Sequence, residues 1–284
     1  MHALRTLVQL RLLTYAQLRQ VSYPTAHPSV TRRRIAQLVR AGAVTTWESP
    51  ARMGGHTRYA LPTAAVTQLL TDRLERDVAG TPLAPLVRLM LPQTRRRALR
   101  LTEASTPNWI SHQTEINTLV LRLSDAATLL WMSSWDCPLP RRVASFDLPQ
   151  PDYVLVEDRA SGPRLVFGEH DRGSEPIERF IARKVLLYGA LAAFPDACAQ
   201  HFGMRSFTVR VTVTDSVRRN PMQRLEELLT ATYRAGGPDS VRLFRFTLAG
   251  WLNAAPDEAI WFSPGHVVAH HGLQRSQHIV RRLP

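Results

Sequence analysis

The sequence predicts a multi-domain α/β protein with a basic N-terminal domain and a C-terminal domain in which helices flank a mixed sheet. Three observations predict it: an uneven charge distribution, a helical period that gives way to a β-hairpin pattern, and a later alternation of helical and strand-like segments. The formal net charge is +13 over 284 residues. The first 100 residues contain 16 arginines and four acidic residues, whereas the remainder contains 20 basic and 19 acidic residues.

This concentration of positive charge predicts a nucleic-acid partner, because side chains that neutralise phosphates release condensed counterions. An anionic membrane surface is the alternative, but no basic amphipathic helix with aromatic anchors is present. No window approaches 18 consecutive apolar residues, so we expect no membrane partner. The two cysteines, Cys137 and Cys198, are far apart and belong to no partner motif, which predicts a reduced, cytoplasmic setting.

Residues 1–70 show the order of elements typical of a winged helix-turn-helix. A helical period covers ALRTLVQLRLL, and Thr14 with Gln17 forms a capping box at the start of TYAQLRQV. A third helix is expected from Ser29 to a C-terminal stop at Gly42. The segments AVTTW and HTRYALP then predict two short strands joined by a basic hairpin.

In this arrangement the third helix is the recognition helix, which lies in the major groove of double-stranded DNA. The candidate DNA-binding residues are Arg32, Arg33, Arg34 and Arg40 on this helix, and Arg52, His56 and Arg58 on the hairpin. A solvated basic face of a protein-interaction module is the alternative interpretation. We also expect a homodimer, which would make the DNA site symmetric.

The rest of the chain divides into three predicted segments. Residues 71–107 are expected to form a helical connector or linker, because prolines interrupt their apolar period. Residues 108–255 alternate between helical segments such as HQTEINTLVLRL and strand-like segments such as DYVLVE, RLVFGEH and SFTVRVTVT, which predicts an α/β domain. The tail, residues 256–284, contains four histidines whose spacing matches no metal signature.

Four acidic side chains stand at the ends or edges of predicted elements in this α/β domain. Glu115 lies on or beside the apolar stripe of its helix. Asp152 follows a proline into a strand, and Glu169 and Asp171 close the next strand. The last two are two residues apart, so in an extended chain they point to the same side.

The single lysine of the chain, Lys184, follows these acids closely. It lies near the middle of a predicted apolar stripe that also contains Ile177, Ile181, Tyr188 and Leu191. Burying an unpaired ammonium group is expensive, so Lys184 needs a charge partner. Chain connectivity makes Asp171 and Glu169 the nearest candidates, and a structural ion-pair network that holds the helix to the sheet is one interpretation.

These motifs resemble the replication-relaxation family of plasmid and mobile-element proteins. The resemblance covers most of residues 1–250, and the string E-x-D-R-G-S-E-P is its most specific part. The residues that carry it are His112-x-x-Glu115-x-Asn117, Pro151-Asp152, Glu169-x-Asp171-Arg172-Gly173-Ser174-Glu175-Pro176 and Lys184-x-x-x-Tyr188. The resemblance implies a DNA-binding protein of plasmid replication, relaxation or mobilisation, with relaxase or replication proteins as partners.

The order of the motifs is also similar to that of the PD-(D/E)xK nuclease fold, in which carboxylates bind Mg²⁺ for phosphodiester cleavage. This resemblance implies Asp152, Glu169 and Asp171 as metal ligands, and Glu115 and Lys184 as catalytic residues. Asp171 departs from the pattern, because active members usually have a lysine there, and Lys184 on the next helix is the substitute. Three functions stay open: a DNA-binding protein with a non-catalytic nuclease-like domain, a metal-dependent endonuclease, and a transcription regulator.

Overall fold

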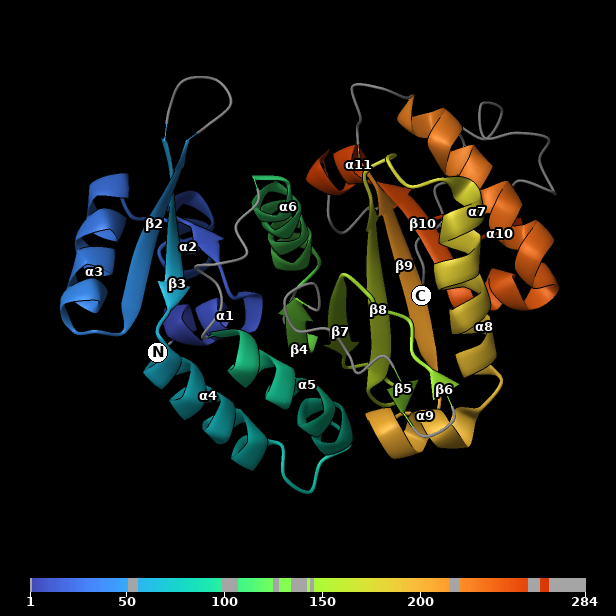
Figure 1. Cartoon of the computed structure of the whole chain (residues 1–284), viewed down its shortest axis with the longest axis horizontal. Coiled ribbons are helices and arrows are strands. Elements are labelled where there is room, and N and C mark those ends of the chain that lie inside the picture. Colours follow the sequence, from blue (N-terminus) through green and yellow to red (C-terminus); the bar gives the residue numbers. More distant parts are fainter. Residues whose placement is uncertain are drawn as a thin grey trace. The chain divides into compact units, whose positions relative to one another are not determined.

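The computed structural model divides the chain into two compact units (Figure 1). It describes residues 2–50, 56–98, 107–124, 128–133, 142–143, 146–214, 220–254 and 261–265. The first unit comprises Met1–Leu121 and Met132–Pro138, and the second comprises Arg122–Trp131 and Leu139–Pro284. Helices combine with a five-stranded mixed sheet and a small antiparallel sheet, which confirms the predicted α/β class. Within the described residues, no helix combines the length and the hydropathy needed to cross a membrane.

The first unit begins with three helices and a small antiparallel sheet, in the order that the sequence predicts. The helices are α1 (His2–Leu10), α2 (Tyr15–Ser22) and α3 (Pro28–Arg40). The strands are β1 (Leu13–Thr14), β2 (Val44–Pro50) and β3 (His56–Pro62), arranged β1-β3-β2. The central strand β3 pairs antiparallel with both neighbours.

Local side-chain chemistry sets the boundaries of these helices. The predicted capping box of α2 is confirmed: the Thr14 hydroxyl accepts from the Gln17 amide at 3.1 Å, and the Gln17 side chain accepts from the Thr14 amide at 2.9 Å. The helix α3 begins one residue earlier than predicted, because the His27 ring caps it by accepting from the Ser29 amide. It ends before Gly42, whose φ of 67° requires a residue without a side chain.

Three further helices complete the first unit: α4 (Ala64–Asp77), α5 (Ala84–Ala98) and most of α6 (Pro107–Leu123). Two long-range hydrogen bonds tie α6 to the N-terminal elements. The Asn117 amide group donates to the Leu12 carbonyl, and the Gln17 amide group donates to the Thr114 carbonyl at 2.9 Å. The structure thus groups α6 with the N-terminal elements, whereas the sequence predicts this helix at the start of the α/β domain.

The second unit is built on a five-stranded sheet in the order β10-β9-β8-β7-β4. Its strands are β4 (Thr128–Ser133), β7 (Tyr153–Glu157), β8 (Arg164–Asp171), β9 (Phe207–Val213) and β10 (Phe244–Leu248), and a separate hairpin contains β5 (Arg142–Val143) and β6 (Phe146–Asp147). The strands β8, β9 and β10 are parallel, and β7 runs antiparallel to β8. The central strands β7, β8 and β9 are almost continuously buried, the pattern of strands that are covered on both faces.

Helices α7, α8 and α10 lie along one side of this sheet (Figure 1). The helices of the unit are α7 (Ile177–Phe180), η1 (Ile181–Val185), α8 (Leu186–Ala192), α9 (Pro195–Phe202), α10 (Pro221–Leu243) and α11 (Ala249–Ala254). The strand β10 begins at Phe244 because α10 continues to Leu243 past a kink at Gly237, whose φ is 56°.

A π turn, η1, interrupts the helical segment that carries the predicted apolar stripe of Lys184. A π turn adds one residue to the helix, so it rotates the faces on either side relative to a regular α-helix. The buried positions are therefore Phe180, Val185, Tyr188 and Leu191, while Ile177, Ile181 and Lys184 are half-buried. Lys184 thus lies at the edge of the apolar face and inside the π turn, not at the centre of the face as predicted.

On the other face of the sheet, the Tyr153 ring lies across Gly168. These two residues are directly paired between β7 and β8. A Cβ atom placed on Gly168 would be 1.9 Å from the Tyr153 ring, far closer than non-bonded carbon atoms can approach. The absence of a side chain at Gly168 therefore allows the aromatic ring to occupy this part of the core.

Candidate functional site

The helix α3 presents arginines on its solvent-facing side. Its core-facing residues are Thr31 and Ile35, which are 2% and 1% exposed. The predicted residues Arg32, Arg33, Arg34 and Arg40 are all exposed. Arg33 and Arg40 are seven residues apart and thus share one helical face. The exposed guanidinium groups are therefore available to an external anion.

The hairpin places only some of its predicted residues within the described part of the chain. Arg58 on β3 is exposed, and its Nε donates to Glu48 Oε1 on β2 at 2.6 Å. His56 begins β3, whereas Arg52 lies outside the described residues. The neighbouring carboxylate of Glu48 thus reduces the net positive field of Arg58.

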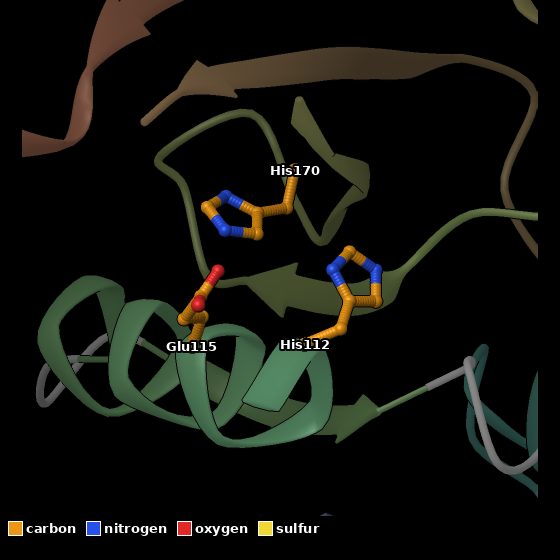
Figure 2. Close-up of side chains that lie close together, drawn as sticks. All are labelled: His112, Glu115 and His170. Atoms are coloured by element: carbon orange, nitrogen blue, oxygen red, sulfur yellow. The ribbon is translucent and has the colours of Figure 1, made fainter. Parts of the chain in front are cut away.

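Glu115, predicted as a catalytic residue, belongs to α6 in the first unit. Figure 2 shows Glu115 and His112 projecting from the same side of this helix, as their spacing of three residues requires. The Ser111 hydroxyl donates to Glu115 Oε1 at 3.1 Å, within the same helix. His170, drawn in the same figure, comes from β8 in the second unit and is buried there.

In the second unit, Glu169 accepts from two side chains of the following helical segment. Its Oε1 accepts from the Tyr188 hydroxyl at 2.6 Å, and its Oε2 is 2.7 Å from Lys184 Nζ. Lys184 also donates to the Gln150 carbonyl, just before the Pro151-Asp152 pair. Glu169 is 3% exposed. Lys184 therefore joins three segments of the chain, and of its two predicted partners the structure selects Glu169.

Asp171, the other candidate partner of Lys184, is paired with Arg224 of α10. Arg224 Nε donates to Asp171 Oδ2 at 2.8 Å and its Nη2 donates to Oδ1 at 3.0 Å, a bidentate arrangement. The Arg224 side chain is 1% exposed and that of Asp171 is 4% exposed. The same guanidinium donates to the Glu175 carbonyl at 2.7 Å. This pair fastens α10 to the turn that follows β8.

Asp152 has a role in the sheet itself. Its amide donates to the Gly168 carbonyl at 2.8 Å, and its Oδ2 accepts from the His170 amide at 2.7 Å. The residue is 8% exposed. Asp152 thus extends the pairing of β7 and β8 by one residue, using its side chain where the backbone ladder ends.

Burial and charge together shift the ionisation of these groups. Burial raises the pKa of Glu169 to about 7, against the opposing effect of Lys184 and with a smaller contribution from Asp152. Burial alone would lower the pKa of Lys184, but the carboxylates of Glu169 and Asp152 outweigh it and the pKa is raised. Burial, followed by the charge of Glu169, also raises the pKa of Tyr188. Glu169 therefore titrates near neutral pH.

We predict that this titration makes the stability of the protein depend on pH. The folded-state pKa of Glu169, about 7, lies above its ordinary value of 4.5, so the folded protein holds this proton more tightly than the unfolded chain. The tighter binding of this proton stabilises the folded protein fully below pH 4.5, and the stabilisation is lost as the pH rises through 7. The free energy of unfolding should therefore fall by up to about 1.4 kcal/mol per pH unit in this range. Urea unfolding of the wild-type protein and of Glu169→Gln, compared at several pH values, measures it.

Because glutamine does not titrate, the stability of wild type relative to Glu169→Gln should fall between pH 5 and pH 8. A difference that stays constant, or that grows with pH, would contradict the raised pKa. Glu178→Gln, a change at an exposed position of α7, is the matched control and should leave the pH profile unchanged.

The carboxylates predicted as metal ligands are engaged by protein donors. Both oxygens of Glu169, both of Asp171 and one of Asp152 accept hydrogen bonds or ion pairs from the residues named above. Among the described residues, these three acids do not bring three ligand atoms within 4.8 Å of one another. Proteins hold Mg²⁺ through one or two carboxylates together with water and substrate phosphate, so a cation here would compete with Lys184 for Glu169 and with Arg224 for Asp171.

Arg224 is the site residue that sequence reasoning misses. It comes from the segment PMQRLEELL, where its neighbours Leu225, Leu228 and Leu229 are fully buried. An arginine beside such an apolar stripe is a weak signal in a chain where 35 of 36 basic residues are arginine. Its pairing with Asp171 spans 53 residues and needs the assembled sheet.

The chain is therefore a two-unit protein, in which a helical unit with an exposed arginine-bearing helix precedes an α/β unit with a buried network of acids, lysine and arginine. The family model described as Replication-relaxation matches residues 4–205, which is more than half of the chain. The chain belongs to the replication-relaxation family, as the motifs of its sequence predict. Comparison with curated proteins gave no match, and neither did comparison with solved structures.

Proposed function

We propose that this protein binds double-stranded DNA of a plasmid or mobile element and acts in its replication, relaxation or mobilisation. Membership of the replication-relaxation family supports a role in replication or relaxation. The observation that carries the binding proposal is the surface of α3, where four exposed arginines follow buried core residues on the same helix. Three helices followed by a hairpin are also the elements of a winged helix-turn-helix.

In this proposal α3 enters the major groove and the hairpin contacts the adjacent backbone or minor groove. Arg33, Gln37 and Arg40 follow one face of α3 at successive turns, which suits a helix lying along a groove. Arg34 donates to Gln37 at 3.1 Å, so these two side chains are held together before DNA arrives. A homodimer would double this surface and read a symmetric site. Relaxase or replication proteins are the proposed protein partners.

We propose a non-catalytic role for the nuclease-like second unit. Glu169 and Asp171 are committed to Lys184, Tyr188 and Arg224, and these contacts hold the helical segments to the sheet. The network is thus better suited to maintaining a rigid α/β unit than to activating water on a metal. The alternative function, a metal-dependent endonuclease, predicts nicking of supercoiled plasmid in the presence of Mg²⁺ that is lost in Asp152→Ala.

The DNA-binding proposal predicts a change in salt dependence. Arg32→Ala combined with Arg33→Ala should weaken binding to a mixed-sequence DNA duplex and lower the slope of log K against log salt by about 2, roughly one for each lost phosphate contact. Fluorescence anisotropy over a series of salt concentrations measures both quantities.

The matched control is Arg73→Ala combined with Arg76→Ala, which removes the same charge from exposed positions of α4 in the same unit. Its salt slope should stay close to that of the wild type. If the two double variants change the slope equally, binding depends on net charge alone and α3 is not the recognition helix.

A further inference from the structure

Three arginines of the second unit share one face of its sheet. The helices α7, α8 and α10 lie along the other face (Figure 1), which is marked by the aromatic side chains that contact Tyr188 of α8, namely Phe167, Phe207 and Phe244. Arg164, Arg210 and Arg245 are each an odd number of residues away from these positions on β8, β9 and β10. Because side chains alternate along a strand, the three arginines lie on the face away from these helices, which we call the outer face.

Strand pairing and side-chain contacts bring these arginines together. Arg210 is directly paired with Arg245 between β9 and β10, and Glu157 of β7 is paired with Arg164 of β8. The Glu157 carboxylate accepts from Arg210 at 3.0 Å and from Arg159, which follows β7, at 2.7 Å. The four guanidinium groups of Arg159, Arg164, Arg210 and Arg245 are called the outer-face arginine cluster below.

The cluster carries more positive charge than the neighbouring carboxylates neutralise. In the part of the chain that the structure describes, one carboxylate, that of Glu157, accepts hydrogen bonds from it. Asp158 is exposed next to β7, and four arginines against these two acids still leave a charge of +2. Burial lowers the pKa of Arg245, and the charges of Arg164 and Arg210 lower it further, so the guanidinium groups repel one another. A bound anion would relieve this repulsion.

Two members of the cluster reach solvent. The Arg159 side chain is 41% exposed and Arg164 is also exposed. Both can therefore contact an external phosphate group through parallel donors, the geometry that guanidinium groups and phosphates share. Arg210, whose side chain is 13% exposed, and the half-buried Arg245 add fixed positive charge to the same field.

An aromatic ring adjoins the cluster. Arg210 Cζ lies 5.3 Å from the centroid of the Trp261 ring. The chain reaches this position because Phe262 forms an antiparallel bridge with Phe246 of β10. By alternation, Phe262 shares the helix-covered face with Phe246, and Trp261 lies on the outer face. The indole is half-buried, so part of its surface stays accessible to a stacking partner.

Exposed guanidinium groups beside an aromatic ring are a combination that proteins use to bind single strands of nucleic acid: the charges follow the phosphates, and an unpaired base stacks on the ring. We propose that the outer-face arginine cluster and Trp261 bind single-stranded DNA, with Arg159 and Arg164 on phosphates and Trp261 on a base. The choice of DNA rests on the proposed function of the protein, whereas the surface itself belongs to the second unit and is separate from α3.

Fluorescence anisotropy of the full-length protein with a fluorescein-labelled oligothymidylate, over a series of salt concentrations, tests the proposal. Arg159→Gln combined with Arg164→Gln should weaken binding at least about tenfold and lower the slope of log K against log salt by about 1.4, roughly 0.7 for each lost phosphate contact. Arg159→Gln alone should lower the slope by about 0.7. Trp261→Leu should weaken binding about fivefold or more with the slope unchanged, because it removes stacking and no charge.

Arg179→Gln combined with Arg183→Gln is the matched control, because it removes the same charge from exposed positions of α7 and η1 on the helix-covered side of the unit. Its affinity and salt slope should stay close to those of the wild type. Urea unfolding of each variant checks that the second unit stays folded.

Binding to a DNA duplex separates this proposal from the proposed function. The Arg159 and Arg164 double variant should bind the duplex as the wild type does, whereas Arg32→Ala with Arg33→Ala should weaken duplex binding more than oligothymidylate binding. The single-strand proposal is overturned if the wild-type protein does not bind the oligothymidylate, if the control weakens this binding as much as the cluster variant does, or if the cluster variant weakens duplex and single-strand binding equally. Loss of duplex binding alone would overturn the role of α3 and support a separate surface for single strands.

Discussion

Arg224→Met is expected to lower the free energy of unfolding by about 3–5 kcal/mol, because it leaves the Asp171 carboxylate buried without its partner. Asp171 and Arg224 are 4% and 1% exposed at their side chains, so water cannot replace the lost donors. The donor to the Glu175 carbonyl is removed as well. Chemical denaturation, with the midpoint and slope compared with the wild type, measures the change.

The control for this prediction is Arg179→Met. Arg179 pairs with Glu175 at 3.4 Å, but its side chain is 54% exposed, so its removal should change stability by less than about 1 kcal/mol. A double variant, Arg224→Met with Asp171→Leu, should be more stable than Arg224→Met alone, because no charge stays buried. If Arg224→Met lowers the free energy of unfolding no more than Arg179→Met does, the buried Asp171–Arg224 pair does not stabilise this unit.

Gly168→Ala should lower the free energy of unfolding by about 3 kcal/mol, nearly as much as Arg224→Met. The added methyl group would lie 1.9 Å from the Tyr153 ring, and the ring is fully buried and has no room to move away. The thermal unfolding temperature and the near-ultraviolet circular dichroism of the tyrosines report the change. Combining it with Tyr153→Leu should recover part of the loss, because the obstructing ring is removed.

Gly189→Ala is the matched control, since it adds the same methyl group at a glycine of α8 that has open space around it. Alanine favours helical backbone over glycine by about 0.5–1 kcal/mol, so this variant should be slightly more stable than the wild type. Equal destabilisation by both substitutions would mean that a clash with the Tyr153 ring is not the cause of the loss of stability.

Features set by neighbouring residues were predictable from the sequence. The capping box of Thr14 and Gln17 is an example, because its donors and acceptors lie within one turn of the helix. The alternation that predicts the α/β class is another, since periodicity depends on local burial. The pairing of Lys184 with Glu169 followed from the cost of burying a charge, although sequence alone left Asp171 as an equal candidate.

Features set by distant segments were not predictable. Arg224 reaches Asp171 only when α10 packs beside the turn after β8, and nothing near Arg224 in the sequence specifies this. A projection at 100° per residue cannot predict the π turn, because that projection assumes a regular helix. The grouping of α6 with the first unit depends on Asn117 and Gln17, whose hydrogen bonds span about a hundred residues.

The single lysine of the chain gives the folded protein a built-in chemical reporter. Apart from the α-amino group, Lys184 Nζ is the primary amine that an acylating reagent can modify, and its side chain is 16% exposed while it is paired with Glu169. A protonated amine held in an ion pair reacts slowly, so acylation at this position measures how often the helical segment leaves the sheet. Mass spectrometry of the labelled protein would thus follow local opening of the second unit at one defined atom, without any engineered label.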